Sequence, residues 1–129
     1  MSNLNSTCAE LLHEVEEAVS VAVVDLTTGR TLAQAQHEAR CPSSYLQATV
    51  AAAVDMYRGK TITRIEQLLT EQRRSEVRHT VREIQLTTDG SYHFLSTLPG
   101  KPQTLALLIT SRQAGRGLGL LALRNALPQ

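Results

Sequence analysis

Val19-Ser-Val-Ala-Val-Val-Asp-Leu-Thr-Thr-Gly-Arg-Thr-Leu-Ala-Gln-Ala35 is the stretch of this sequence that decides its fold. The first part is rich in β-branched residues and is apolar at nearly every position up to Asp25. Leu26-Thr-Thr-Gly29 then has the composition of a turn, and a more polar run follows from Arg30 to Ala35. The pattern predicts a β-hairpin. Because the first strand has no polar face, we expect it at the centre of a sheet covered on both sides.

A helix is predicted on each side of this hairpin. Before it, Ser6-Thr-Cys-Ala-Glu10 has capping-box spacing, and apolar residues recur at intervals of three and four from Cys8 to Ala18. After it, Pro42 and two serines favour the start of a second helix, from Tyr45 to Tyr57, which is apolar or small almost throughout. A helix apolar nearly all round needs cover on two sides. We expect one cover to be the sheet and the other a second copy of the chain.

The second half of the chain is predicted to add a further helical stretch and a strand meander. Gly59 is expected to break or kink the second helix, which then resumes to about Gln72. Asp89-Gly90 is a strong hairpin signal that places His93 opposite Leu86. The three strands predicted are Val77–Thr87, Tyr92–Leu98 and Thr104–Thr110. A last helix is predicted from Leu118 to Leu127.

These elements follow one another in the order α-β-β-α-β-β-β-α. Hairpins within each group of strands make most neighbouring strands antiparallel. The sequence therefore predicts an α+β fold, with a five-stranded, mostly antiparallel sheet sandwiched between helices in a profilin-like layout. With 129 residues the chain has the size of one ordinary domain, so residues 1–129 are expected to form a single unit.

The composition favours a folded, soluble protein. Hydrophobic residues make up 42% of the chain and charged residues 19%, which argues against disorder. No apolar run reaches the roughly 18 residues that a membrane-spanning helix needs, and the N-terminus does not resemble a signal peptide. We therefore expect a cytoplasmic protein without membrane partners, in which Cys8 and Cys41 are reduced thiols rather than a disulfide.

The glycine-rich run Gly115-Arg-Gly-Leu-Gly119 raises the question of a phosphate site. A dinucleotide fingerprint needs a glycine where Leu120 stands, and a Walker loop needs a Gly-Lys-Ser/Thr ending that is absent here. The chain given also ends ten residues after Gly119, which leaves no room for a second parallel strand. The run is therefore interpreted as a tight strand-to-helix turn, and no cofactor is expected.

No residue pattern in the chain predicts catalysis or metal binding. The four histidines, which we expect at the surface or the rim, lack metal-ligand spacing: His13, His37, His79 and His93. Cys41 precedes a helix and lies near His37, but nothing in the sequence supplies a base or an oxyanion hole. The acidic residues 14, 16 and 17 are interpreted as the solvated face of the first helix. The chain is therefore predicted not to be an enzyme.

Nucleic-acid binding is also not expected. Arg73 to Arg82 is basic, but it has no interleaved aromatic residues for stacking, and the net charge of the whole chain is only +1. We interpret this basic segment mainly as an edge strand protected by charge. The alternative interpretation is a surface that binds a protein partner.

Two parts of the chain resemble the Roadblock family of dynein light chains and bacterial GTPase regulators. The first is Leu11 to Ala33, in which a helix runs into a strand ending in Val-Asp, followed by a glycine turn and a short second strand. The second comprises the closing meander, Gln85 to Leu95 and Thr104 to Ile109, and the helix at Gly117 to Arg124. The match spans nearly the whole chain and is one of pattern. It departs from the family at residues 60–78, which are longer than expected.

The resemblance implies a non-enzymatic dimer in which the second helices pack together and the third strands join two sheets. It further implies a regulator or scaffold whose partners are itself, as a homodimer, and a small Ras-like GTPase or a motility or signalling assembly. The residues expected at the dimer interface are Leu46, Val50, Ala53, Val54, Tyr57, Val81 and Ile84. The alternative is a small-ligand sensor of profilin-like or PAS-like type, with a pocket between sheet and helix.

Overall fold

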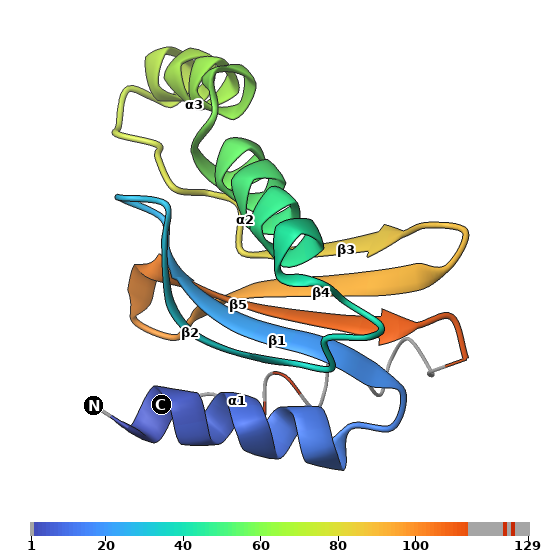
Figure 1. Cartoon of the computed structure of the whole chain (residues 1–129). Coiled ribbons are helices and arrows are strands. Elements are labelled where there is room, and N and C mark those ends of the chain that lie inside the picture. The colour runs from blue at the N-terminus through green and yellow to red at the C-terminus, as the bar shows by residue number, and fades with distance from the viewer. Residues whose placement is uncertain (1, 114–122, 124, 126–129) are drawn as a thin grey trace.

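Five antiparallel strands form one sheet at the centre of the molecule, with α1 on one face and α2 on the other (Figure 1). The computed structural model describes residues 2–113, 123 and 125. Its elements are α1 (Ser2–Glu14), β1 (Ala18–Asp25), β2 (Arg30–Gln36), α2 (Ser43–Arg58), α3 (Lys60–Arg73), β3 (Glu83–Thr87), β4 (Ser91–Leu98) and β5 (Lys101–Ser111). The strands lie in the order β2-β1-β5-β4-β3. The predicted α+β class and order of elements are confirmed.

The middle of the sheet is apolar on both faces. Seven of the eight residues of β1 are buried, and β5 beside it is buried from Leu105 to Thr110. Such strands are stable only where both faces are covered, which helices on opposite sides provide. The predicted hairpin of β1 and β2 and its central first strand are thus confirmed.

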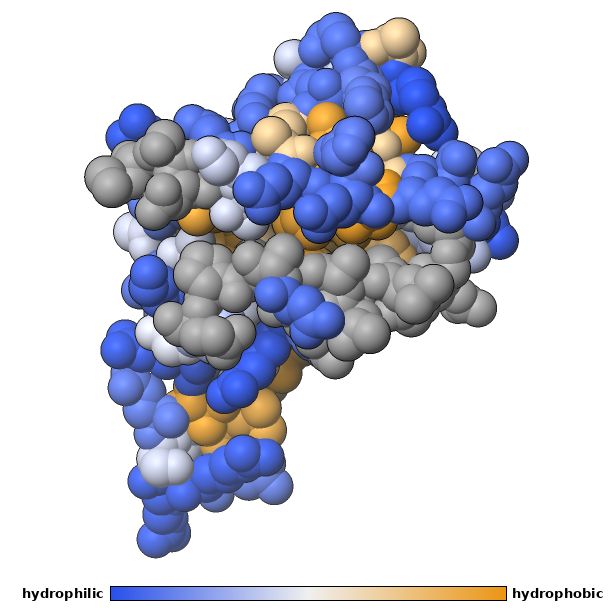
Figure 2. Space-filling view, turned by 90° about the horizontal axis from the view of Figure 1, so that it is seen from below, coloured by the Kyte–Doolittle hydropathy of each residue, from blue (hydrophilic) through white to orange (hydrophobic). Residues whose placement is uncertain are grey.

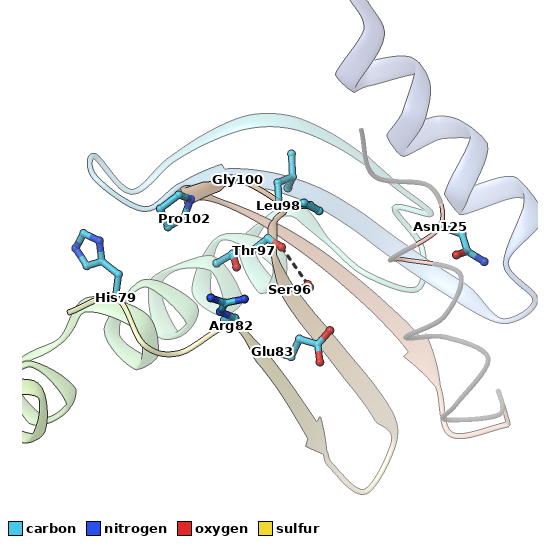
Figure 3. Close-up of a pocket in the computed structure, with 10 residues that line it drawn as sticks. His79, Arg82, Glu83, Ser96, Thr97, Leu98, Gly100, Pro102 and Asn125 are labelled. Carbon is cyan, nitrogen blue, oxygen red and sulfur yellow. Dashed lines mark hydrogen bonds between the residues drawn. The ribbon is translucent and has the colours of Figure 1, made fainter. Parts of the chain in front are cut away.

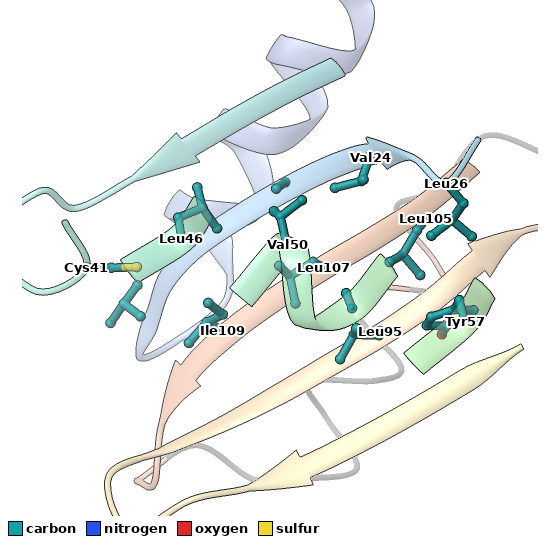
Figure 4. Packing of buried hydrophobic residues seen from close by; sticks show 13 residues of the cluster. Val24, Leu26, Cys41, Leu46, Val50, Tyr57, Leu95, Leu105, Leu107 and Ile109 are labelled. Carbon is teal, nitrogen blue, oxygen red and sulfur yellow. The ribbon is translucent and has the colours of Figure 1, made fainter. Parts of the chain in front are cut away.

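Alternate side chains along these strands enter two separate cores. On the α2 side, Leu105, Leu107 and Ile109 of β5 pack with residues of α2, among them Leu46 and Tyr57 (Figure 4). On the α1 side, the intervening residues of β5 pack with Cys8 and Leu11 of α1 and with Phe94 of β4. Seen from the α1 side, the described surface is mostly hydrophilic, with smaller hydrophobic areas between the polar groups (Figure 2).

Gly59 separates α2 from α3, as the sequence predicts. Its backbone is extended, with φ −73° and ψ 176°, and its N–H donates to the carbonyl of Asp55 at 2.8 Å. A Cβ atom at this position would collide with the carbonyl oxygen and the carboxylate of Asp55. Only glycine allows this close approach, so the break between the two helices is fixed by sequence.

Several predicted boundaries are wrong. α1 begins at Ser2, so the capping-box residues Ser6 and Thr7 lie inside the helix. α1 ends at Glu14, and Glu17 lies beyond it, at φ 66°, where its carboxylate accepts a hydrogen bond from the Ser111 hydroxyl at 2.7 Å. The third strand starts at Glu83 rather than at residue 77, because residues 77–80 are bound to α3 instead of β4.

The predicted glycine turn and last helix fall outside the described residues except for two positions. Leu123 and Asn125 are both helical. Leu123 is fully buried in the core on the α1 side.

The position of β5 at the centre of the sheet gives a stability prediction. Leu107 is fully buried, whereas Leu32 on the outer strand β2 is 45% exposed. Leu107→Ala removes packed atoms and leaves a cavity, so it should lower the free energy of unfolding by about 2–5 kcal/mol. Leu32→Ala is the matched control and should cost about 0.5 kcal/mol or less. Urea denaturation measures both, and equal losses would contradict the assignment of the core.

Candidate interaction surface

Four of the residues expected at a dimer interface are buried within one chain. Leu46, Val50, Ala53 and Tyr57 line the side of α2 that faces the sheet, and none is more than 3% exposed (Figure 4). The Tyr57 hydroxyl donates to the carbonyl of Arg82 at 2.9 Å, and burial raises the pKa of this tyrosine. These side chains have no free surface to offer, so a second copy would have to meet another face of α2.

The other three expected interface residues, Val54, Val81 and Ile84, lie at the margin of the same core and are partly buried. Val54 is on the side of α2 near Gly29, in the turn between β1 and β2. Ile84 is on β3, directly opposite Leu95 of β4. The three residues are therefore not gathered on one exposed patch.

An apolar groove lies between α2 and the β3–β4 hairpin. Its volume is about 240 Å³, and it is lined by Tyr45, Ala48, Thr49, Ala52 and Met56 of α2 and by Leu86, Thr88, His93 and Leu95 of the hairpin. Tyr45 is 44% exposed and Leu86 37%. Exposed large apolar side chains that adjoin one groove are typical of interaction surfaces rather than of an ordinary solvated face.

One end of this groove is fixed by a hydrogen bond between Tyr45 and His93. The tyrosine hydroxyl and Nε2 of the imidazole are 3.0 Å apart. His93 is only 4% exposed, so the expectation that all four histidines lie at the surface or the rim is wrong. His93 does lie opposite Leu86, as the hairpin predicts. The sequence could not reveal its cover by α2, because the two partners are 48 residues apart.

β3 is an edge strand next to the groove. Within the described chain it pairs only with β4, and four of its five residues are exposed. The order of strands places no other described strand on its outer side, so residues 84–87 form an edge at which another strand could pair. Arg82 immediately precedes it and is exposed, whereas Arg78 lies in the segment before and is 3.7 Å from Glu76. The basic charge therefore lies before this edge strand, and the only charged residue within it is Glu83.

A second hollow, of about 700 Å³, lies at the end of the sheet where β4 turns into β5 (Figure 3). Arg82 and Glu83 bring opposite charges to it, and the Ser96 hydroxyl is bonded to the carbonyl of its neighbour Thr97 at 3.2 Å. No described side chain in its lining is both buried and without a hydrogen-bond partner. Nothing in this lining selects a particular ligand.

The described residues do not form a metal site or contain an activated thiol. No group of three or more histidine, cysteine, aspartate and glutamate residues among them is arranged to hold a metal ion. Both cysteines are free and buried. Burial raises the pKa of Cys8 to about 11 and also raises the pKa of Cys41, which is the opposite of what a nucleophilic thiol needs. None of the helices described is long and apolar enough to cross a membrane.

Burial of His93 predicts a pH dependence of stability. Burial lowers the pKa of this imidazole below its ordinary value of 6.5, so the unfolded chain binds the proton more readily than the folded one. The stabilisation of the fold by neutral His93 is fully present above pH 6.5 and is lost as the pH falls towards the pKa of the imidazole in the folded chain. The unfolding free energy should therefore drop more between about pH 7.5 and about pH 5.5 in the wild type than in His93→Gln.

His79, whose pKa is also lowered, is present in both proteins, so their difference isolates His93. Denaturant titrations at the two pH values give the result. Equal losses in the two proteins would show that His93 is not held in its neutral form by burial.

Solved structures of other proteins resemble this chain in fold, although no family model or curated protein matches its sequence. Among solved structures, it superposes on Myxococcus xanthus MglB with a TM-score of 0.68 and 12% identity, covering 97% of this chain and 82% of that one. It superposes on a Roadblock/LC7 domain from Streptomyces avermitilis with a TM-score of 0.67 and 16% identity, covering 95% and 89%. It superposes on the gliding protein MglB from Thermus thermophilus with a TM-score of 0.64 and 14% identity, covering 98% of this chain and 89% of that one. The chain therefore has the Roadblock fold, with α2 followed by a further helix.

Proposed function

We propose that this chain is a non-enzymatic dimeric regulator or scaffold that acts on a small Ras-like GTPase or within a motility or signalling assembly. The observation that carries the proposal is the apolar groove between α2 and the edge strand β3. The fold supports it, because the similar structures include a Roadblock domain, two MglB proteins and an MglB described as having a tetrameric arrangement.

The groove and the edge strand together fit a second copy of the chain. A two-fold axis near the middle of β3 would pair the two β3 edges antiparallel and make one continuous sheet. It would also set the two α2 helices side by side, each against the groove of the other. The side chains of α2 that meet there include Ala48 and Ala52, which are small and allow the helix backbones to approach closely.

A second candidate function uses the same groove as a ligand pocket. The buried imidazole of His93 favours it, because its Nδ1 has no hydrogen-bond partner within the described chain. The volume of about 240 Å³, however, lies below the roughly 300–1,000 Å³ of small-molecule sites. Native mass spectrometry distinguishes the two, since a sensor would retain a small molecule at one per chain.

A charge placed in the groove should separate the dimer. Ala52 is exposed in one chain, so Ala52→Glu leaves the fold intact but buries like charges near the two-fold axis. The wild type should have the mass of two chains by light scattering, and the variant that of one, with unchanged circular dichroism. Ala9→Glu, on the exposed side of α1 at the opposite face, is the control and should remain dimeric. A wild type of one-chain mass would refute the proposed dimer.

The GTPase part of the proposal has its own test. The immobilised dimer should retain, from an extract of its own cells, a protein with a P-loop sequence, more strongly with a non-hydrolysable GTP analogue than with GDP. Mass spectrometry identifies the retained proteins. If no P-loop protein is retained, the chain has no GTPase partner in that extract. The scaffold role would then depend on the test of dimerisation alone.

A further inference from the structure

α3 stands away from the sheet (Figure 1). It carries a stripe of apolar side chains at helical spacing, two of which are exposed. The stripe consists of Ile62, Ile65, Leu68 and Leu69, which recur at helical spacing. Ile65 is 47% exposed and Leu68 48%. They are three residues apart, so they lie next to each other on the helix and form one small apolar patch.

Two polar contacts bind α3 to the segment that follows it. The carboxylate of Glu66, which is 6% exposed, accepts hydrogen bonds from the backbone N–H of Thr80 at 2.8 Å and from its hydroxyl at 2.7 Å. The hydroxyl of Thr70 accepts from the N–H of Val77 at 2.8 Å and donates to its carbonyl at 3.2 Å. Residues 77–80 thus bind the polar side of the helix. Ile62 and Leu69 are partly buried, whereas Ile65 and Leu68 are exposed and remain available to something outside the chain.

The direction of α2 relative to β3 indicates where the stripe would lie in the proposed dimer. The C-terminal end of α2 lies at the start of β3, where Tyr57 is bonded to Arg82. The N-terminal end of α2 lies at the other end of β3, where Tyr45 is bonded to His93, the residue opposite Leu86. Antiparallel pairing of two β3 strands sets the start of one beside the end of the other. The α3 of each copy, which follows the C-terminal end of α2, therefore comes to the Tyr45 end of the second copy.

Exposed apolar side chains lie at both of the places that this pairing would bring together. Five large hydrophobic side chains are exposed among the described residues, and four of them belong to α2, α3 and β3: Tyr45, Ile65, Leu68 and Leu86. The two on α3 and the two on the groove are at opposite ends of α2 in one chain. A two-fold axis would bring them together.

We propose that α3 is an exchanged arm: its stripe, centred on Ile65 and Leu68, packs on Tyr45 and Leu86 at the groove end of a second copy of this chain. The proposal rests on the proposed dimer and adds to it the contact that selects the partner copy. The arm extends the interface beyond α2 and β3, and each copy covers the exposed apolar surface of the other. A chain that lacked residues 60–80 would form only the smaller contact.

A disulfide between copies tests the contact directly. Leu68→Cys protein is mixed with Tyr45→Cys protein and oxidised, and we expect a covalent dimer that contains one of each. The native cysteines are at most 1% exposed and contribute little background. Gln67→Cys is the control: Gln67 is also exposed but lies on the side of α3 that faces residues 76–78, so it should link to Tyr45→Cys far less. If light scattering shows a dimer but Leu68→Cys links no better than Gln67→Cys, the arm is refuted and the dimer stands. A one-chain mass refutes both.

A second measurement keeps the proposal testable without cysteines. Leu68→Ser should raise the dimer dissociation constant on the order of tenfold, because an apolar side chain buried in the interface is lost. Leu32→Ser is the control: Leu32 is 45% exposed, close to Leu68 at 48%, but lies on the opposite edge strand. An unchanged constant for Leu68→Ser, with binding to another protein or to anionic vesicles lost instead, would assign the stripe to that partner and overturn the proposal.

Discussion

The rest of this structure depends on the need to cover β1 and β5 on both faces. These two strands are apolar throughout their middle, and neither can face water without a large cost in free energy. α1 and α2 are therefore required on opposite sides, and the order of strands follows because the two most apolar ones lie inside. The polar strands β2 and β3 become the edges. The edge beside the apolar groove, β3, is thus a consequence of what the centre of the sheet requires.

Two tyrosines then set the direction of α2. Tyr57 near its end is bonded to the backbone before β3, and Tyr45 near its start is bonded to His93 of β4. Leu46, Val50 and Tyr57 fix the side of the helix that packs on the sheet, while the alanines on its other sides add little to that choice. The hydrogen bonds of the two tyrosines add to this packing by joining each end of the helix to the β3–β4 region.

The sequence predicts those features that local patterns determine. The hairpin at Val19–Ala35, the break at Gly59 and the pairing of His93 with Leu86 all follow from composition and spacing, and all are present. Leu46, Val50, Ala53 and Tyr57 of α2 recur at helical spacing and are the side buried in the fold, but the sequence does not tell whether such a stripe meets the sheet or a second copy. The true start of β3 was equally hidden, since it depends on Glu66 binding a threonine 14 residues away. Contacts between distant polar residues leave no periodic signal.

The segment from Gly59 to Arg82, which contains α3, leaves the end of α2 and returns to the sheet close to that same end, at the start of β3. Its two ends are held together by the bond from Tyr57 to the Arg82 carbonyl, and its own helix is stabilised by contacts inside the segment. Changing the length of such a closed loop costs little, about 0.6 kcal/mol for each doubling. Residues 60–80 could therefore be replaced by another sequence without a change in the pairing of the strands. Such a replacement would change the surface that the molecule presents to a partner.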